Sequence, residues 1–259
     1  MTNFTLQRGR MPLLISLPHD GSFIPDDIAA RMHPVARSSP DTDWHVGRLY
    51  GPLAQALGAS VLKPLASRYV IDLNRPADGH ALYPGQRETG LVSTIGFDGA
   101  PLYLDGGLPD AAEIQQRIND YWQPYHQALA HELATLHAEH GRVVLWEGHS
   151  IRSRVPILFD GQLPDFNLGT ASGTSCAAPL QAGLQACMES QARYSFAVNG
   201  RFKGGYITRH YGNPAANIQA VQLELVQLNY MNEKSFAYDE GQAVAVQELI
   251  SQMLHVCLQ

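Results

Sequence analysis

The 259-residue sequence lacks the features that mark several large classes of protein. Its 18 lysines and arginines are outnumbered by 24 aspartates and glutamates, which gives a net charge of -6, and they form no basic block. A nucleic-acid-binding or membrane-binding surface is therefore not indicated. Its apolar runs are all far shorter than the roughly 20 residues that cross a bilayer. We expect neither a nucleic-acid nor a membrane partner.

Cysteine is also scarce. Cys176, Cys187 and Cys257 form no CxxC pair and no spacing typical of a metal site, so we expect reduced, mostly buried thiols. The apolar stretch near the N-terminus covers only about seven residues and is followed by no small-residue cleavage site, unlike a secretory signal. The sequence therefore predicts a cytoplasmic protein whose first apolar run is a core strand.

Two kinds of catalytic loop are missing. Neither GxxxxGK[ST] nor GxGxxG occurs around Gly204 and Gly205, so a phosphate-binding loop is not indicated. Ser150 lies outside any GxSxG motif, which makes serine-hydrolase chemistry a weak alternative.

The apolar pattern predicts an α/β fold with helices on both faces of a largely parallel sheet. No low-complexity stretch divides the chain, so we expect one domain over residues 1–259. Apolar runs predict strands at 13–18, 60–65, 69–73, 143–146, 156–159, 194–198 and 221–226. Helical spacing predicts four helices: one capped by Asp41 or Asp43 and ending near Leu57, one from Asp110 to Gly141, and others over 175–191 and 240–256. Residues 76–109 are rich in glycine and proline, which favours a functional loop region.

Polar side chains follow or interrupt four of the predicted strands. His19 follows the first run, and His149 follows the run at 143–146. Asn74 and Arg75 follow the run at 69–73, and Glu224 interrupts the last one. Ligands of such sheets collect beyond the carboxyl ends of the strands, so we expect these groups to meet.

Two histidines and a carboxylate are a common ligand set for a catalytic zinc ion that keeps one position open. Zinc activates water and polarises a carbonyl, and Glu224 is the candidate general base. Each residue also has an ordinary interpretation. A single histidine after a strand is more often hydrogen-bonded or exposed, Asp43 alone is more often a helix cap, and Glu224 is as often a structural ion-pair member.

Other charged residues separate into two groups. The histidines of the long predicted helix are expected on its solvated face, since the HExxH spacing is broken at Thr135. Arginines near the strand ends indicate an anionic ligand in this acidic protein, because guanidinium groups bind carboxylates in a planar, two-pronged manner. The histidines are His126, His131, His137 and His140, and the arginines are Arg68, Arg75, Arg152, Arg154, Arg201 and Arg209.

Seven segments carry a resemblance over nearly the whole chain, and their combination is far more specific than any one of them. They are LISLPHDGSFIP, DTDWHVGRLY, SRYVIDLNRP, LYPGQ, the stretch from GHSIRS to PDFNLGT, NGRFKGGYITRHYG and AVQLELVQLNYM. With them the sequence resembles the N-formylglutamate amidohydrolase (N-formylglutamate deformylase) family.

The resemblance implies a fold related to zinc carboxypeptidases, with a mixed, mostly parallel sheet, and the hydrolysis of N-formyl-L-glutamate to L-glutamate and formate in histidine degradation. It implies His19, His149 and Asp43 as zinc ligands, with Asp41 or His45 as alternatives to Asp43, and Glu224 as the general base. Arg75 with Asn74, and also Arg152 and Arg209, are the implied binders of the substrate carboxylates. Glu147 stands where the family pattern favours a shorter aspartate.

Several alternatives stay open. The site residues also suit a zinc hydrolase of another small N-acyl amino acid or of a cell-wall peptide amide, or a non-catalytic metal- or anion-binding module. Co²⁺ and Mn²⁺ can occupy such a ligand set as well as Zn²⁺. The sequence does not determine the oligomeric state, or whether residues 76–109 close over the substrate.

Overall fold

The chain forms one mixed sheet of seven strands in a computed structural model that describes residues 3–82, 85 and 88–259. The strands are β1 (Phe4–Gln7), β2 (Leu13–Ser16), β3 (Ser60–Pro64), β4 (Val143–Ile151), β5 (Phe166–Gly169), β6 (Phe196–Val198) and β7 (Ile218–Val226), in the order β1-β3-β2-β4-β7-β5-β6. The central strands β3, β2, β4 and β7 are parallel. Strand β1 is antiparallel to β3, and β5 is antiparallel to β7. The carboxyl ends of the four central strands therefore lie at the same edge of the sheet.

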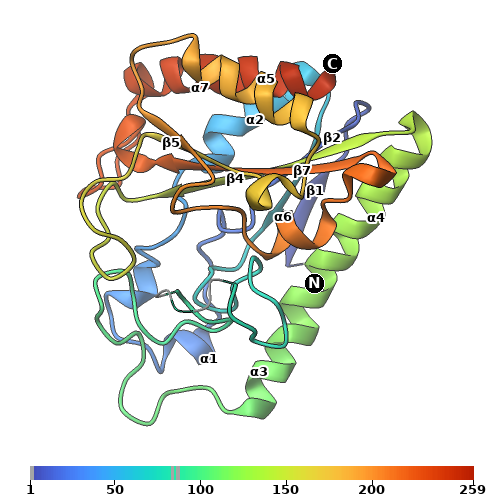
Figure 1. The fold of residues 1–259 in the computed structure, drawn as a ribbon. Coiled ribbons are helices and arrows are strands. Elements are labelled where there is room, and N and C mark those ends of the chain that lie inside the picture. The colour runs from blue at the N-terminus through green and yellow to red at the C-terminus, as the bar shows by residue number, and fades with distance from the viewer. Residues whose placement is uncertain (1–2, 83–84, 86–87) are drawn as a thin grey trace.

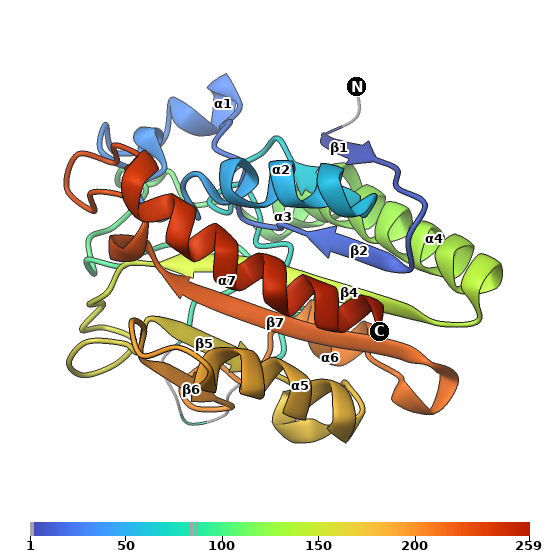
Figure 2. The ribbon, with the colours of Figure 1, turned by 90° about the horizontal axis from the view of Figure 1, so that it is seen from above.

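Helices cover both faces of this sheet, which confirms the predicted α/β architecture (Figures 1 and 2). One face carries α2 (Val46–Leu57), α5 (Ala178–Glu189) and α7 (Glu240–Leu258). The other carries a long helical rod and α6 (Tyr206–Tyr211). The rod consists of α3 (Ala111–Arg117), a π-helical segment (Ile118–Trp122) and α4 (Gln123–His140), while the single-turn α1 (Asp26–Ala29) lies among the loops.

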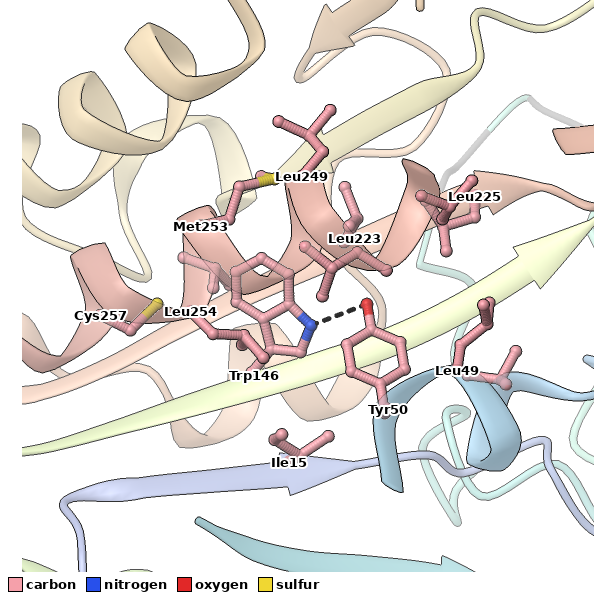
Figure 3. Close-up of a cluster of buried hydrophobic side chains, with 14 of the residues drawn as sticks. Ile15, Leu49, Tyr50, Trp146, Leu223, Leu225, Leu249, Met253, Leu254 and Cys257 are labelled. Carbon is pink, nitrogen blue, oxygen red and sulfur yellow. Dashed lines mark hydrogen bonds between the residues drawn. The ribbon is translucent and has the colours of Figure 1, made fainter. Parts of the chain in front are cut away.

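The larger hydrophobic core lies between the sheet and the first group of helices (Figure 3). Trp146 of β4 is fully buried there, and its indole N–H donates a 2.9 Å hydrogen bond to the hydroxyl of Tyr50 on α2. Gly148 lies beside this pair, and a Cβ atom there would come within 2.8 Å of the Tyr50 ring and 2.7 Å of Leu17. The close contact of α2 with β4 therefore requires glycine.

Strand β4 divides its side chains between the two faces because successive residues of a strand point in opposite directions. Val144 and Trp146 lie in the core under α2 and α7, whereas Leu145 packs against the long helix α4. Glu147 lies on the same side as Leu145, since its carboxylate accepts a hydrogen bond from Thr208 of α6. The face of β4 that packs toward α4 and α6 is thus apolar at Leu145 and polar at Glu147.

Five strands and all four helices of the prediction are found, with shifted ends. Two predicted strands are wrong, because 69–73 and 156–159 form turns. Two observed strands, β1 and β5, were not predicted; both are only four residues long. Helix α3 begins as expected, with the Asp110 side chain accepting from the Glu113 amide.

The predicted cap of α2 is wrong. The helix begins after His45, which makes no side-chain cap, and the carboxylates of Asp41 and Asp43 bind other groups, although the Asp43 carbonyl accepts from the Val46 amide at 3.3 Å. The carboxylate of Asp20, far earlier in the chain, accepts instead from the Gly47 amide at 2.8 Å. Asp41 and Asp43 are consequently available for other contacts.

The predicted loop region 76–109 contains no helix and only isolated β-bridges among its described residues. Residues 83–84 and 86–87, and with them most of the LYPGQ motif, lie outside the described part of the chain. No described helix is both long and apolar enough to cross a membrane.

Candidate metal centre and active site

Three residues predicted as metal ligands form one buried cluster at the carboxyl edge of the sheet. A ligand atom from each of His19, Asp43 and His149 lies within 4.8 Å of the other two. Asp43 Oδ2 is 3.0 Å from His149 Nδ1 and 3.7 Å from His19 Nδ1. Both imidazole rings therefore turn the same nitrogen toward one carboxylate.

Backbone contacts bring these three residues together from distant parts of the chain. His19 follows β2, and its carbonyl accepts from the Asp43 amide at 3.1 Å. Asp43 Oδ2 accepts from the Ser150 amide of β4 at 3.0 Å. The segment before α2 is therefore bound to the ends of two neighbouring strands.

The second nitrogen of each imidazole is held by a further carboxylate. His19 Nε2 lies 2.7 Å from Asp72 Oδ1, and His149 Nε2 lies 3.0 Å from Glu147 Oε1. The other Asp72 oxygen accepts from Arg68 at 2.9 Å. Carboxylates in this position fix the orientation and tautomer of metal-binding histidines. Glu147 fills this position, so the longer side chain noted in the sequence is accommodated.

The cluster has the donors and the spare bonding capacity that a divalent cation requires. Among the described residues nothing donates a hydrogen bond to the buried Asp43 Oδ1, and the Arg68 guanidinium lies 3.5 Å from it. Burial disfavours the charged form of Asp43, but His19 and His149 outweigh it and hold its pKa well below the usual range. Burial likewise opposes charge on His149, while hydrogen bonds to Asp43 and Glu147 raise its pKa well above the usual range. The group therefore fits a cation.

Glu224 lies beside the cluster, because β4 and β7 are in register with His149 opposite Glu224. Its side chain lines the same cavity as His19 and His149 and is only 7% exposed. Burial raises the pKa of Glu224 to about 8, with Asp43 and Glu147 adding to the rise and His149 and Arg68 opposing it. A carboxyl group with a pKa near neutrality can both accept and return a proton.

Three arginine side chains line the cavity beside the cluster. Arg68, Arg75 and Arg201 all contribute to it, together with Asn74 and Gln222. Arg75 also makes a 2.5 Å ion pair with Glu88, and both side chains are mostly buried in the wall of the cavity. Asp72, Glu88 and Glu224 line the cavity as well, so it presents three guanidinium groups among three carboxyl groups. A small carboxylate ligand could bind through these guanidinium groups.

The other predicted carboxylate-binding arginines lie elsewhere. Arg152 pairs with Asp41, and Arg209 donates to the Gly204 carbonyl at 2.8 Å. Neither is among the residues that line the cavity. Of the six arginines that the sequence places near the strand ends, Arg68, Arg75 and Arg201 line the cavity in the described part of the chain.

The two alternative ligands to Asp43 are bound to other groups. Asp41 Oδ2 accepts from the Tyr69 hydroxyl and the Phe97 amide, and the His45 ring lies 2.7 Å from the Phe236 carbonyl. Neither belongs to the cluster. Asp72 and Glu147 were not predicted to hold the histidines. Asp72 contacts His19 from a separate segment of the chain, and Glu147 contacts His149 within strand β4.

The expectation of a solvated histidine face is wrong for His126. Its ring is buried between Leu73 and Tyr211, with Nε2 2.9 Å from the Leu73 carbonyl and Nδ1 2.9 Å from the Tyr211 hydroxyl. His137 is half-buried and contacts the Ala216 carbonyl. His131 and His140 follow the expectation more closely, being exposed.

A buried set of two histidines and a carboxylate beside an arginine-lined cavity, at the carboxyl edge of a mixed α/β sheet, fits the class of hydrolytic enzymes. Comparison with known proteins identifies the particular family. A sequence model of the N-formylglutamate amidohydrolase family matches residues 11–231, and the chain belongs to that family.

Relatives and solved structures agree. The chain is 50% identical to an N-formylglutamate deformylase of Pseudomonas aeruginosa and 48% identical to one of Pseudomonas putida, each alignment covering 98% of this chain and 95% of the relative. A crystal structure of N-formylglutamate amidohydrolase from Ralstonia eutropha JMP134 is similar with a TM-score of 0.84 and 28% identity, over 99% of this chain and 97% of that one. The Agrobacterium tumefaciens protein Atu2144 shares the fold at a TM-score of 0.74 and 16% identity, over 99% and 95% of the two chains.

Proposed function

We propose that this protein hydrolyses N-formyl-L-glutamate to L-glutamate and formate with a divalent metal ion, zinc, as its cofactor. The observation that carries the proposal is the His19, Asp43 and His149 cluster, whose two histidines line the same cavity as Arg68, Arg75 and Arg201. The names of the relatives supply the substrate. A dicarboxylate with a small amide matches a small cavity that presents three arginines beside a group able to hold a metal ion.

His19 and His149 would hold the metal through their Nδ1 atoms and Asp43 through its carboxylate, with Asp72 and Glu147 fixing the two rings. When bound, a divalent ion supplies Lewis-acid polarisation of the amide carbonyl. With two histidines and one carboxylate as ligands, a bound zinc ion would keep room for substrate or water, as catalytic zinc sites do.

Glu224 would act as the general base and acid. It would take a proton from the attacking water and return it to the glutamate nitrogen as formate leaves. Arg68, only 3.5 Å from Asp43 Oδ1, would stabilise the negative charge that develops on the formyl oxygen.

Arg75, with Asn74 beside it, would bind one substrate carboxylate, and Arg201 would bind the other. Arg152 and Arg209, both predicted carboxylate ligands, lie outside the cavity wall, so we assign them no direct contact. Because the formyl group needs little space, larger acyl groups would be excluded by the shape of the cavity. We also propose a place in histidine degradation, while the cytoplasmic location stays a prediction.

The deciding experiment measures formate release from N-formyl-L-glutamate by the purified protein. The protein is assayed as purified, after treatment with a chelator, and after zinc is added back. Release that the chelator abolishes and zinc restores supports both substrate and metal. Release that is indifferent to chelation retains the substrate and refutes the metal assignment.

N-acetyl- and N-succinyl-L-glutamate, tested in parallel, distinguish this function from hydrolysis of another N-acyl amino acid. No hydrolysis of any of the three by zinc-loaded protein, combined with tight binding of glutamate, would favour the non-catalytic binding module instead. Repeating the assay with Co²⁺ and Mn²⁺ would show which metal supports the highest turnover.

A further inference from the structure

The segment Leu73–Arg75, of which Asn74 and Arg75 line the cavity, belongs to no strand, so its backbone carbonyls need other partners. All three find one on the helices of the same face. The Leu73 carbonyl accepts from His126 Nε2 at 2.9 Å, the Asn74 carbonyl from the Tyr206 amide at 3.3 Å, and the Arg75 carbonyl from Trp122 Nε1 at 2.8 Å. Two of these donors are side chains of the long helical rod, about 50 residues further along the chain.

The two side-chain donors form one stacked unit. The rings of Trp122 and His126 lie 3.8 Å apart with an interplanar angle of 27°. Residues four apart share a helix face, so both rings point toward the same segment. Trp122 closes the π-helical segment Ile118–Trp122, and π-helical turns within α-helices frequently accompany functional sites.

The protonation of His126 follows from its partners. Burial lowers its pKa to about 4, so the ring is neutral at pH 7 and carries one N–H. A carbonyl can only accept, so that hydrogen lies on Nε2 and is donated to Leu73. Nδ1 then accepts from the Tyr211 hydroxyl, 2.9 Å away.

The segment that these donors hold carries two residues of the proposed site. Asn74 Nδ2 lies 3.1 Å from His149 Nε2, and its Oδ1 accepts from the Ile207 amide at 2.9 Å. Arg75, the next residue, presents its guanidinium group to the cavity. A displacement of this backbone would therefore move Arg75 relative to the metal-binding cluster.

We propose that Trp122 and His126 are positioning residues for substrate binding: their ring N–H groups fix the backbone of Leu73 and Arg75 so that the Arg75 side chain meets the substrate carboxylate at a set distance from His149. The assignment of Arg75 to a carboxylate rests on the proposed function. The hydrogen bonds that position it do not.

The test uses Trp122→Phe and His126→Phe in the full-length, zinc-loaded protein, because phenylalanine keeps the stacked rings and removes the N–H donor. We expect the KM for N-formyl-L-glutamate to rise about fivefold, the equivalent of one neutral hydrogen bond, with kcat changed by less than about twofold. His137→Phe is the matched control, since it removes a ring-to-carbonyl bond of the same helix that reaches Ala216 and not the cavity. Its KM should stay at the wild-type value.

A double-mutant cycle separates positioning from a general loss of stability. In an Arg75→Ala background, Trp122→Phe should change kcat/KM by less than about twofold, because its effect passes through Arg75. If the two changes multiply as independent effects, or if His137→Phe raises the KM equally, the proposal is wrong.

Hydrogen exchange makes the test independent of the substrate. Faster amide exchange in the peptide spanning residues 70–76 of Trp122→Phe, at unchanged midpoint of unfolding, supports the positioning role even if the wild-type protein releases no formate. Unchanged exchange in that peptide refutes it, whereas the absence of formate release refutes only the proposed function.

Discussion

Replacing Glu147 should weaken metal binding without removing any proposed ligand. Its two oxygens hold His149 Nε2 at 3.0 Å and the Thr208 hydroxyl at 2.5 Å, and the side chain is buried. Glu147→Ala leaves both partners without an acceptor and frees the imidazole to rotate. Loss of such a carboxylate typically lowers metal affinity by about 10- to 100-fold, or roughly 1.4 to 2.8 kcal/mol.

Two further variants give the expected order of effects. Glu147→Gln keeps an oxygen within reach of His149 and loses only the charge, so its zinc affinity should lie between those of the wild type and Glu147→Ala. Thr208→Val removes the bond to the far oxygen alone and should change zinc affinity by no more than about threefold.

The assay is competition for zinc against a chromophoric chelator, with the free energy of unfolding measured on the same samples. A Glu147→Ala protein that folds and binds zinc as tightly as the wild type would refute the reasoning. So would a Thr208→Val protein more impaired than Glu147→Ala.

Four more predictions concern catalysis and stability. Glu224→Gln should retain zinc and lose about 100- to 10,000-fold in kcat; turnover near the wild-type rate would remove Glu224 from the role of base. Arg75→Ala should lower kcat/KM by about 30-fold or more, mainly through KM, and an unchanged value would place it outside the binding site. Because the folded-state pKa of His126 is about 4, below its unfolded value, the unfolded chain binds the proton first, and stability should fall by up to about 3 kcal/mol as the pH drops from about 6.5 to 4. Denaturant unfolding should show a shallower decline in His126→Phe; an equal decline contradicts this origin. Tyr50→Phe should cost about 1 to 3 kcal/mol by leaving the Trp146 indole N–H buried without an acceptor, and a midpoint of thermal unfolding equal to that of the wild type would contradict it.

The sequence predicts the parts of the fold that depend on periodicity over many residues. The helix from Asp110 and the one that ends before Gly58 follow from such patterns, whereas the central strands were predicted from short continuous apolar runs. Strands β1 (FTLQ) and β5 (FNLG) were not predicted because neither contains a continuous apolar run, whereas the equally short β2 (LLIS) does. The run at 69–73 is as apolar as a strand. The carbonyls of Val70 and Leu73, however, accept hydrogen bonds from the side chains of Arg117 and His126 and not from a neighbouring strand.

The sequence predicted the position of site residues that follow a central strand. It predicted less well the residues whose position depends on contacts between separate loops. His19 and His149 lie at the expected edge, and Asp43 joins them in space. Nothing in local spacing distinguishes Arg201, in the cavity wall, from Arg152, which pairs with Asp41. Guanidinium groups reach far, so their partners depend on how separate loops pack.

Strand β4 carries core residues on one face and site residues on the other, which has a consequence for the thermal stability of the site. The strand that carries Glu147 and His149 also buries Trp146, and Gly148 lies packed against the ring of Tyr50 between them. A shift by a single residue would turn Glu147 and His149 into the apolar interior and the Trp146 indole toward the opposite face of the sheet. Glu147 and His149 therefore cannot be displaced without displacing the part of the core around Trp146. Heat should abolish metal binding and tertiary structure in one event, and the working site should persist up to that temperature.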